Sequence, residues 1–172
     1  MIEIDSLSAT QAQPLLASLC EVLHGCVADG ASVGFIDADD RAVMARFWQD
    51  KIYSLASGDN QLLVAWQAGE IVATVMLGFS SMPNGRHRAE ISKLLVHPRA
   101  RRQGIARRLM LRAEQLAQQQ GKTLLLLDTR SGDVASALYL SLGWQVAGSI
   151  PCYAESTAGE LDATTVMYKR LT

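Results

Sequence analysis

The sequence contains few cysteines and no long apolar run. Its three cysteines, Cys20, Cys26 and Cys152, are an odd number without CxxC spacing, which argues against both a disulfide framework and a structural zinc site. No apolar run approaches the roughly 18 residues that a membrane-spanning helix needs. The N-terminus also lacks a basic region followed by an apolar stretch, so no secretory signal is expected. We therefore expect a cytoplasmic protein with no membrane partner and no bound metal.

Net charge is also small, although its distribution is uneven. The formal charge is −1, which predicts no general affinity for nucleic acids or membranes. Between Arg86 and Arg112, however, nine lysines and arginines accompany one acidic residue, Glu90, so this window carries +8 and the remainder −9. We expect a polyanionic ligand to bind within the window. A nucleic acid is not expected there, because no aromatic residues interleave with the arginines.

The length of 172 residues predicts a single domain over residues 1–172 with a sizeable core. Hydrophobic periodicity predicts helices at 10–28, 39–56, 104–120 and 133–142, and strands at 2–6, 61–66, 70–79, 89–97, 122–128, 144–150 and 164–171. The strand–helix–strand segment over 89–128 predicts a parallel, right-handed crossover. The tight Ala68-Gly69 connection predicts an antiparallel hairpin. The fold class is therefore α/β (α+β) with a mixed sheet.

A candidate phosphate site lies where the strand at 89–97 gives way to the next helix. A helix N-terminus presents unpaired N–H groups and a partial positive charge, which favours phosphate binding. Gly104 and Ala106 are small where the backbone must approach an anion, and Arg101 and Arg102 add charge. A solvated basic helix start is the alternative interpretation.

Two segments in this region carry a family resemblance. Arg101-x-x-Gly104-x-Ala106 resembles the pyrophosphate-binding motif of the GCN5-related N-acetyltransferase (GNAT) family, and Tyr139-x-x-x-Gly143 followed by Trp144 resembles that family's Y-x-x-x-G-F segment. The resemblance is clearest over residues 60–171. Segments 30–35, 83–85 and 127–129 extend it towards the tabtoxin-resistance type of acetyltransferase.

The resemblance implies acetyl-CoA as cosubstrate, no metal, and a mostly antiparallel sheet with a central parallel β-α-β unit and helices on both faces. It also implies a monomer or homodimer, with residues 1–59 shaping the acceptor site. The implied cofactor contacts are backbone of Leu94, Leu95 and Val96 on the pantetheine arm, and Arg101, Arg102, Gln103, Gly104, Ile105, Ala106 and Arg107 around the pyrophosphate. Gly132 stands where many relatives have asparagine, so Ser131, Ser136 or backbone would substitute.

Acetyl transfer to an amine needs a neutral amine, a donor for the developing oxyanion and a proton for the departing thiolate. An N–H near Leu94 or Leu95 is the candidate oxyanion donor. The resemblance places the Tyr139 hydroxyl near the CoA sulfur, which makes Tyr139 the candidate general acid. On the same predicted helix, Val134, Leu138 and Leu142 form a neighbouring stripe expected to pack inward.

Glu90 and Asp128 are the candidate bases. Glu90 is the only acid in the basic window, and Asp128 closes the adjacent parallel strand, at the carboxyl edge where ligands bind in open α/β sheets. Two other interpretations stay open: a salt bridge from Glu90 to Arg88 or Lys93, and a capping role for Asp128 at the next helix.

These observations lead to one preferred function and two alternatives. The preferred function is N-acetylation of a small-molecule amine by direct attack in a ternary complex, with an amino-acid-like toxin or antibiotic as one acceptor class. Acetylation of a protein or peptide amine is the second hypothesis, and a non-catalytic acetyl-CoA-binding module is the third.

Overall fold

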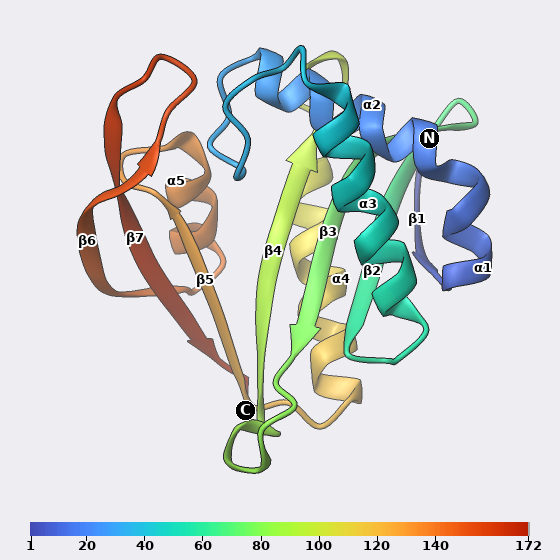
Figure 1. The fold of residues 1–172 in the computed structure, drawn as a ribbon. Coiled ribbons are helices and arrows are strands. Elements are labelled where there is room, and N and C mark those ends of the chain that lie inside the picture. Colours follow the sequence, from blue (N-terminus) through green and yellow to red (C-terminus); the bar gives the residue numbers. More distant parts are fainter. Residues whose placement is uncertain (172) are drawn as a thin grey trace.

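The chain alternates between helices and strands along most of its length (Figure 1). The computed structural model describes residues 1–171. Its strands are β1 (Ile2–Leu7), β2 (Asn60–Gln67), β3 (Glu70–Phe79), β4 (Arg88–Val96), β5 (Leu124–Arg130), β6 (Gln145–Glu155) and β7 (Leu161–Arg170). Its helices are α1 (Ala9–Ala12), η1 (Gln13–Leu15), α2 (Leu16–Ala28), α3 (Arg41–Leu55), η2 (Pro83–Gly85), η3 (Pro98–Ala100), α4 (Ile105–Gln119) and α5 (Val134–Ser141), where η marks a 3₁₀ turn. Within residues 1–171, no helix has both the length and the apolarity that crossing a membrane requires.

The seven strands found in residues 1–171 form one sheet in the order β1-β2-β3-β4-β5-β7-β6. Every neighbouring pair is antiparallel except β4 and β5, which run parallel. Parallel neighbours need a long crossover connection, and α4 provides it. The expected mixed, mostly antiparallel sheet with one parallel β-α-β unit is therefore confirmed.

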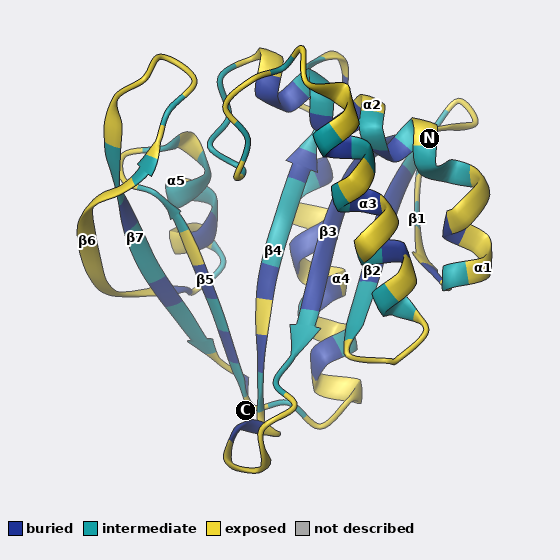
Figure 2. Ribbon diagram, viewed as in Figure 1, coloured by how far each residue is buried: buried dark blue, intermediate teal, exposed yellow. Residues whose placement is uncertain are grey.

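Buried residues of the strands and of the helices beside them (Figure 2) form two apolar cores, one on each face of the sheet. On one face α2 and α3 bury Leu19 and Trp48 against β2, and on the other α4 buries Leu109 against the strands. Tyr139 of α5 packs in the same core as the buried face of α4. The apolar residues of α4 recur every three or four positions, which explains why one side of that helix is buried. By contrast, β6 at the sheet edge is exposed along nearly all of its length.

Strands β4 and β5 separate part-way along their length. They share three partner pairs, of which the last joins Glu90 to Leu126. Beyond that pair β4 continues against β3 as far as Val96, and β5 continues against β7 as far as Arg130. The facing edges over 91–96 and 127–130 therefore have no sheet partner, although backbone N–H and C=O groups require one in some form.

A β-bulge at Lys93 interrupts the side-chain alternation of β4. The register with β3 skips here, so that Lys93 and Leu94 both lie opposite Val75. Lys93 has a positive φ of 51°, and the buried Thr74 hydroxyl donates a 2.8 Å hydrogen bond to its carbonyl. As a result Leu95 packs into the α2–α3 core, whereas uninterrupted alternation from Ile91 would place it in the α4 core.

Several element boundaries differ from the predicted ones. The helix predicted over 10–28 is divided by η1, because Pro14 has no N–H and crowds the preceding turn. The strand predicted over 144–150 continues to Glu155, and the strand predicted over 164–171 already begins at Leu161. This hairpin is held by backbone pairing at the sheet edge, so burial patterns in the sequence do not mark its ends.

Candidate active site

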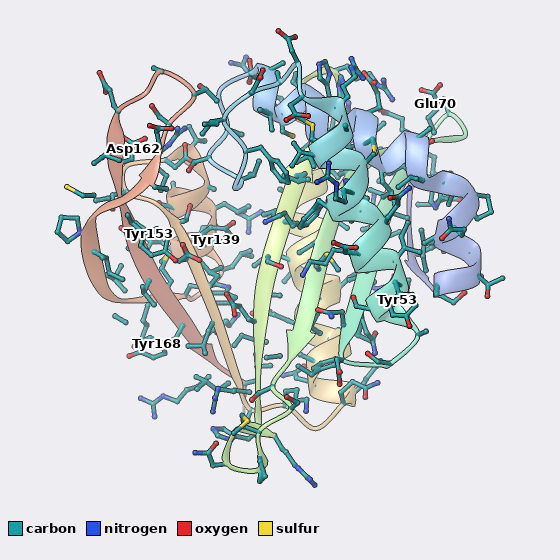
Figure 3. All side chains as sticks on the ribbon, viewed as in Figure 1. Tyr53, Glu70, Tyr139, Tyr153, Asp162 and Tyr168 are labelled. Atoms are coloured by element: carbon teal, nitrogen blue, oxygen red, sulfur yellow. The ribbon has the colours of Figure 1, made fainter. Side chains whose placement is uncertain are left out.

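A cleft of about 970 Å³ lies between the diverging halves of β4 and β5. Its walls also include the N-terminus of α4, part of α5, the α2–α3 loop and the β6–β7 hairpin. In Figure 3, Tyr139, Tyr153 and Asp162 lie on the β5 side of the molecule. The volume is at the upper end of the about 300–1,000 Å³ typical of ligand sites. The cleft can therefore hold a cofactor-sized molecule.

At one end of the cleft, the loop between β4 and α4 turns through left-handed backbone. Arg102 has a φ of 63° and Gly104, the N-cap of α4, has a φ of 73°. No side chain of residues 1–171 caps this helix, so its first-turn amides are available to hydrogen-bond a ligand. These amides and the helix dipole make the corner suitable for an anion. The predicted loop residues that line the cleft here are Arg101, Arg102, Gly104, Ile105, Ala106 and Arg107.

Arg101 holds the α2–α3 loop against the end of β4. Its guanidinium pairs with Asp29 and donates from Nε to the Val96 carbonyl at 3.3 Å. On the other side of the cleft, Arg130 of β5 donates to the Gly30 carbonyl of the same loop at 3.2 Å. The loop is thus tied to both strands that border the cleft. A ligand that uses the Val96 carbonyl would share it with Arg101.

Two predicted cofactor residues are not among the residues that line the cleft. The Gln103 side chain accepts a 2.7 Å hydrogen bond from Gln67 on the protein surface. Ser136 is half-buried on α5. Ser131, one of the possible substitutes for the family asparagine, shares a 2.7 Å hydrogen bond with Thr165. A contact from the Gln103 backbone stays a prediction.

Tyr139 lines the cleft from α5 and is the buried residue of that helix. Its ring centroid lies 6.1 Å from that of Trp144. Burial raises the pKa of the Tyr139 phenol to about 12, with smaller contributions from Asp133 and Asp128. The phenol is therefore protonated near neutral pH, as a general acid must be. The expectation that Val134 packs inward is wrong, because its side chain is 89% exposed.

Asp128 lies further along β5 and lines the cleft. Its carboxylate accepts a 2.8 Å hydrogen bond from the hydroxyl of Thr164, which is buried on β7. Glu90 is exposed on β4, does not line the cleft and forms no ion pair with any residue of 1–171. Because Glu90 is paired with Leu126, alternation places Glu90 and Asp128 on the same face of the sheet.

The candidate acid and the candidate bases lie on opposite faces of the sheet. Tyr139 belongs to the α4 core, whereas alternation along β5 turns Asp128 away from Leu127 of that core. The gap between β4 and β5 connects the two faces. The arrangement therefore allows one reactant to approach beside Tyr139 and the other past Asp128.

Lys93 and Thr164 are among the polar residues of the cleft that sequence reasoning missed. The sequence suggests Lys93 only as an ion-pair partner for Glu90, yet Lys93 lines the cleft from the β4 bulge. Burial lowers the pKa of its amine, and the nearby Lys51 lowers it further. Thr164 carries no local signal, because its partner Asp128 lies 36 positions earlier in the chain.

These features define an α/β protein whose ligand cleft opens between two parallel strands, with an uncapped helix N-terminus at one end. The sequence matches the profile of the acetyltransferase (GNAT) family over residues 25–144, which is more than half of the chain. The chain therefore belongs to this family and is an acetyltransferase.

Solved structures share this fold over nearly the whole chain. One is yncA, a proposed acetyltransferase from Salmonella typhimurium solved with its cofactor acetyl-CoA; it is 21% identical, with 100% of this chain and 95% of that chain covered and a TM-score of 0.78. A ribosomal-protein-alanine N-acetyltransferase from Brucella melitensis is 23% identical over 98% and 99% of the two chains, with a TM-score of 0.75. A protein described as a proposed phosphinothricin N-acetyltransferase is 18% identical over 100% and 99%, with a TM-score of 0.79.

Proposed function

We propose that this protein transfers an acetyl group from acetyl-CoA to the amine of a small molecule. The observation that carries the proposal is the uncapped N-terminus of α4, entered through left-handed Gly104, at the mouth of the cleft between β4 and β5. It offers amides for a diphosphate, with Arg102 and Arg107 nearby to add positive charge. The unpaired edge of β4 over 91–96 offers backbone groups to an amide-containing arm, as in β-strand addition.

In the proposed reaction the neutral amine nitrogen of the acceptor attacks the thioester carbonyl carbon. The C–N bond forms and the C–S bond breaks. Asp128 or Glu90 takes the proton lost by the amine, directly or through water, and the Tyr139 hydroxyl protonates the departing thiolate. A backbone N–H near Leu94 or Leu95 stabilises the developing oxyanion. Asp128 is favoured over Glu90 as the base because it lines the cleft, where the Thr164 hydroxyl holds its carboxylate in place.

A small acceptor is favoured over a polypeptide. The pairs Arg101–Asp29 and Arg130–Gly30 tie the α2–α3 loop across the end of the cleft, where a protein substrate would need an open groove. The resemblance to the tabtoxin-resistance type favours an amino-acid-like toxin or antibiotic as acceptor. Similarity to the proposed phosphinothricin N-acetyltransferase points in the same direction.

A CoA-release assay across a panel of acceptors tests the proposed function. The panel contains simple amines, amino acids, aminoglycosides, β-lactam-like compounds and alanine-terminated peptides, all with acetyl-CoA at saturation. We expect CoA release with at least one small amine and little with the peptides. Preferential turnover of peptides would support protein acetylation. Acetyl-CoA binding by calorimetry without any CoA release would instead support a non-catalytic binding module.

The base assignment is tested by comparing Asp128→Asn with Glu90→Gln. Both substitutions remove one negative charge at nearly constant size, and only Asp128 lines the cleft. We expect Asp128→Asn to lower kcat/KM by about 100-fold, the lower end of the range for general acid–base catalysis, and Glu90→Gln to have the smaller effect. The reverse order would make Glu90 the base.

A further inference from the structure

Lys93 is a cleft lysine whose ammonium group lies over an aromatic ring. Its Nζ lies 5.1 Å from the centroid of the Phe47 ring on α3, and Lys51 Nζ lies 5.7 Å from the same centroid. Within residues 1–171 neither lysine forms an ion pair. Lys93 lines the cleft, whereas Phe47 and Lys51 are not among the lining residues. Two ammonium groups therefore converge on one aromatic ring. The charges of Asp128 and Glu90 act on Lys93, but neither carboxylate forms an ion pair with it.

This arrangement is held in place by the backbone. The bulge places Lys93 at a φ of 51°, a region that side-chain-bearing residues adopt at a cost. The buried Thr74 hydroxyl fixes the bulge by donating to the Lys93 carbonyl. Burial and the charge of Lys51 lower the pKa of the Lys93 amine, and the charges of Asp128 and Glu90 offset this only in part. An anion bound beside Lys93 would relieve this cost, because it stabilises the charged form.

We propose that Lys93 determines acceptor specificity by binding a carboxylate that the acceptor carries in addition to its amine. The inference rests on the proposed function, in which Asp128 or Glu90 receives the amine. These two acids lie on the same face of the sheet as the Phe47–Lys93 contact. On this face the cleft thus offers the Asp128 carboxylate for an ammonium group and the Lys93 cation for a carboxylate, which matches a zwitterionic amino acid or a close analogue.

The same reasoning disfavours acceptors that carry no carboxylate. A polycationic aminoglycoside would bring several ammonium groups towards Lys93 and Lys51, and like charges at short range are mutually unfavourable. A simple alkylamine, which carries no carboxylate, would leave Lys93 without a partner and would gain no charge-assisted hydrogen bond from it. Phe35 packs edge-on against Phe47 at 5.4 Å, so both lysines stand beside an aromatic surface.

The test compares free amino acids with their α-carboxamides. The probes are L-methionine, L-glutamate and L-phenylalanine, each paired with its own carboxamide. We expect kcat/KM to favour the free acids by at least about tenfold, the factor that corresponds to about 1.4 kcal/mol. The amine of a carboxamide is less basic and is more often neutral near pH 7, so intrinsic reactivity works against this result. In Lys93→Met the preference should fall to within about twofold, while Lys93→Arg should keep it.

Lys122→Met is the matched control, because Lys122 also lies over an aromatic ring, 5.0 Å from the Phe79 centroid, but is not among the residues lining the cleft. It should keep the preference for free acids. Calorimetry with the same probes on CoA-saturated protein tests the inference without turnover. Equal binding of acids and carboxamides by the wild type, or an undiminished preference in Lys93→Met, would overturn the inference. Failure of every amine to release CoA, with acid-selective binding intact, would count against the proposed function alone.

Discussion

Replacing Tyr139 with phenylalanine removes one hydroxyl from the cleft and leaves the aromatic ring in place. The ring packs against Trp144 with 6.1 Å between centroids and is 6% exposed, so phenylalanine can keep the same packing. We expect the stability of the variant near neutral pH to stay within about 1 kcal/mol of wild type. The affinity for acetyl-CoA should change by no more than about threefold, because the proposed diphosphate contacts lie on α4.

The chemical step should respond much more strongly. A positioned general acid contributes about 10²–10⁴-fold to rate, so we expect the single-turnover rate of Tyr139→Phe to fall by about 100-fold. The measurement uses enzyme in excess over acetyl-CoA, with saturating acceptor, so that product release does not mask the step. An unchanged single-turnover rate would remove Tyr139 from the acid role. A fall in rate matched by an equal fall in acetyl-CoA affinity would assign the hydroxyl to binding instead.

The raised pKa of Tyr139 predicts a further difference at alkaline pH. The phenol titrates near pH 10 in the unfolded chain and at about 12 in the folded protein. Between these values the unfolded state loses the proton and the folded state keeps it, so wild-type stability falls as pH rises. Relative to Tyr139→Phe the loss should reach about 2–3 kcal/mol by pH 12 and should be absent below pH 10. Urea unfolding of the wild type and Tyr139→Phe from pH 9 upward measures this loss of stability. A stability difference between the two proteins that does not change with pH would contradict the conclusion that burial raises the pKa of Tyr139.

Three further substitutions test the architecture around the cleft. Gly104→Glu should abolish acetyl-CoA binding, measured by calorimetry. In Gly104→Ala the new Cβ meets nothing within 4 Å, so this variant should lose only about 1–2 kcal/mol of stability to the left-handed backbone. Equal affinities of the two variants for acetyl-CoA would refute the placement of the diphosphate. Gly25→Ala should lower the free energy of unfolding in urea by about 1–3 kcal/mol, because the new Cβ would lie 2.6 Å from His97 Nε2. A raised Tm of the variant would contradict this steric clash. Thr164→Val should lower kcat/KM by about tenfold and shift its pH profile, because the Asp128 carboxylate loses its hydrogen bond. Thr164→Ser keeps a hydroxyl and should restore both kcat/KM and the pH profile. Equal losses in both variants would indicate a purely structural role for Thr164.

Local sequence patterns predict most of the elements. The apolar spacing of α4 marks that helix, and the apolar run over 124–127 marks strand β5. The predicted hairpin at Ala68-Gly69 is confirmed, since both residues have the positive φ that a two-residue turn requires. Gly104 also marks the entry to α4, because few other residues adopt its backbone conformation. Such signals are readable because they depend on residues within a few positions of one another.

The sequence by itself therefore determined the order of elements, the parallel crossover and the corner at Gly104. Only the tertiary structure decided what faces the cleft. The bulge at Lys93 depends on Thr74, and the orientation of Asp128 depends on Thr164, which comes from another strand. The separation of β4 from β5 likewise has no local signature, because it depends on which strands stay paired. These contacts join residues that are distant along the chain, and local periodicity carries no information about which distant partner each side chain meets.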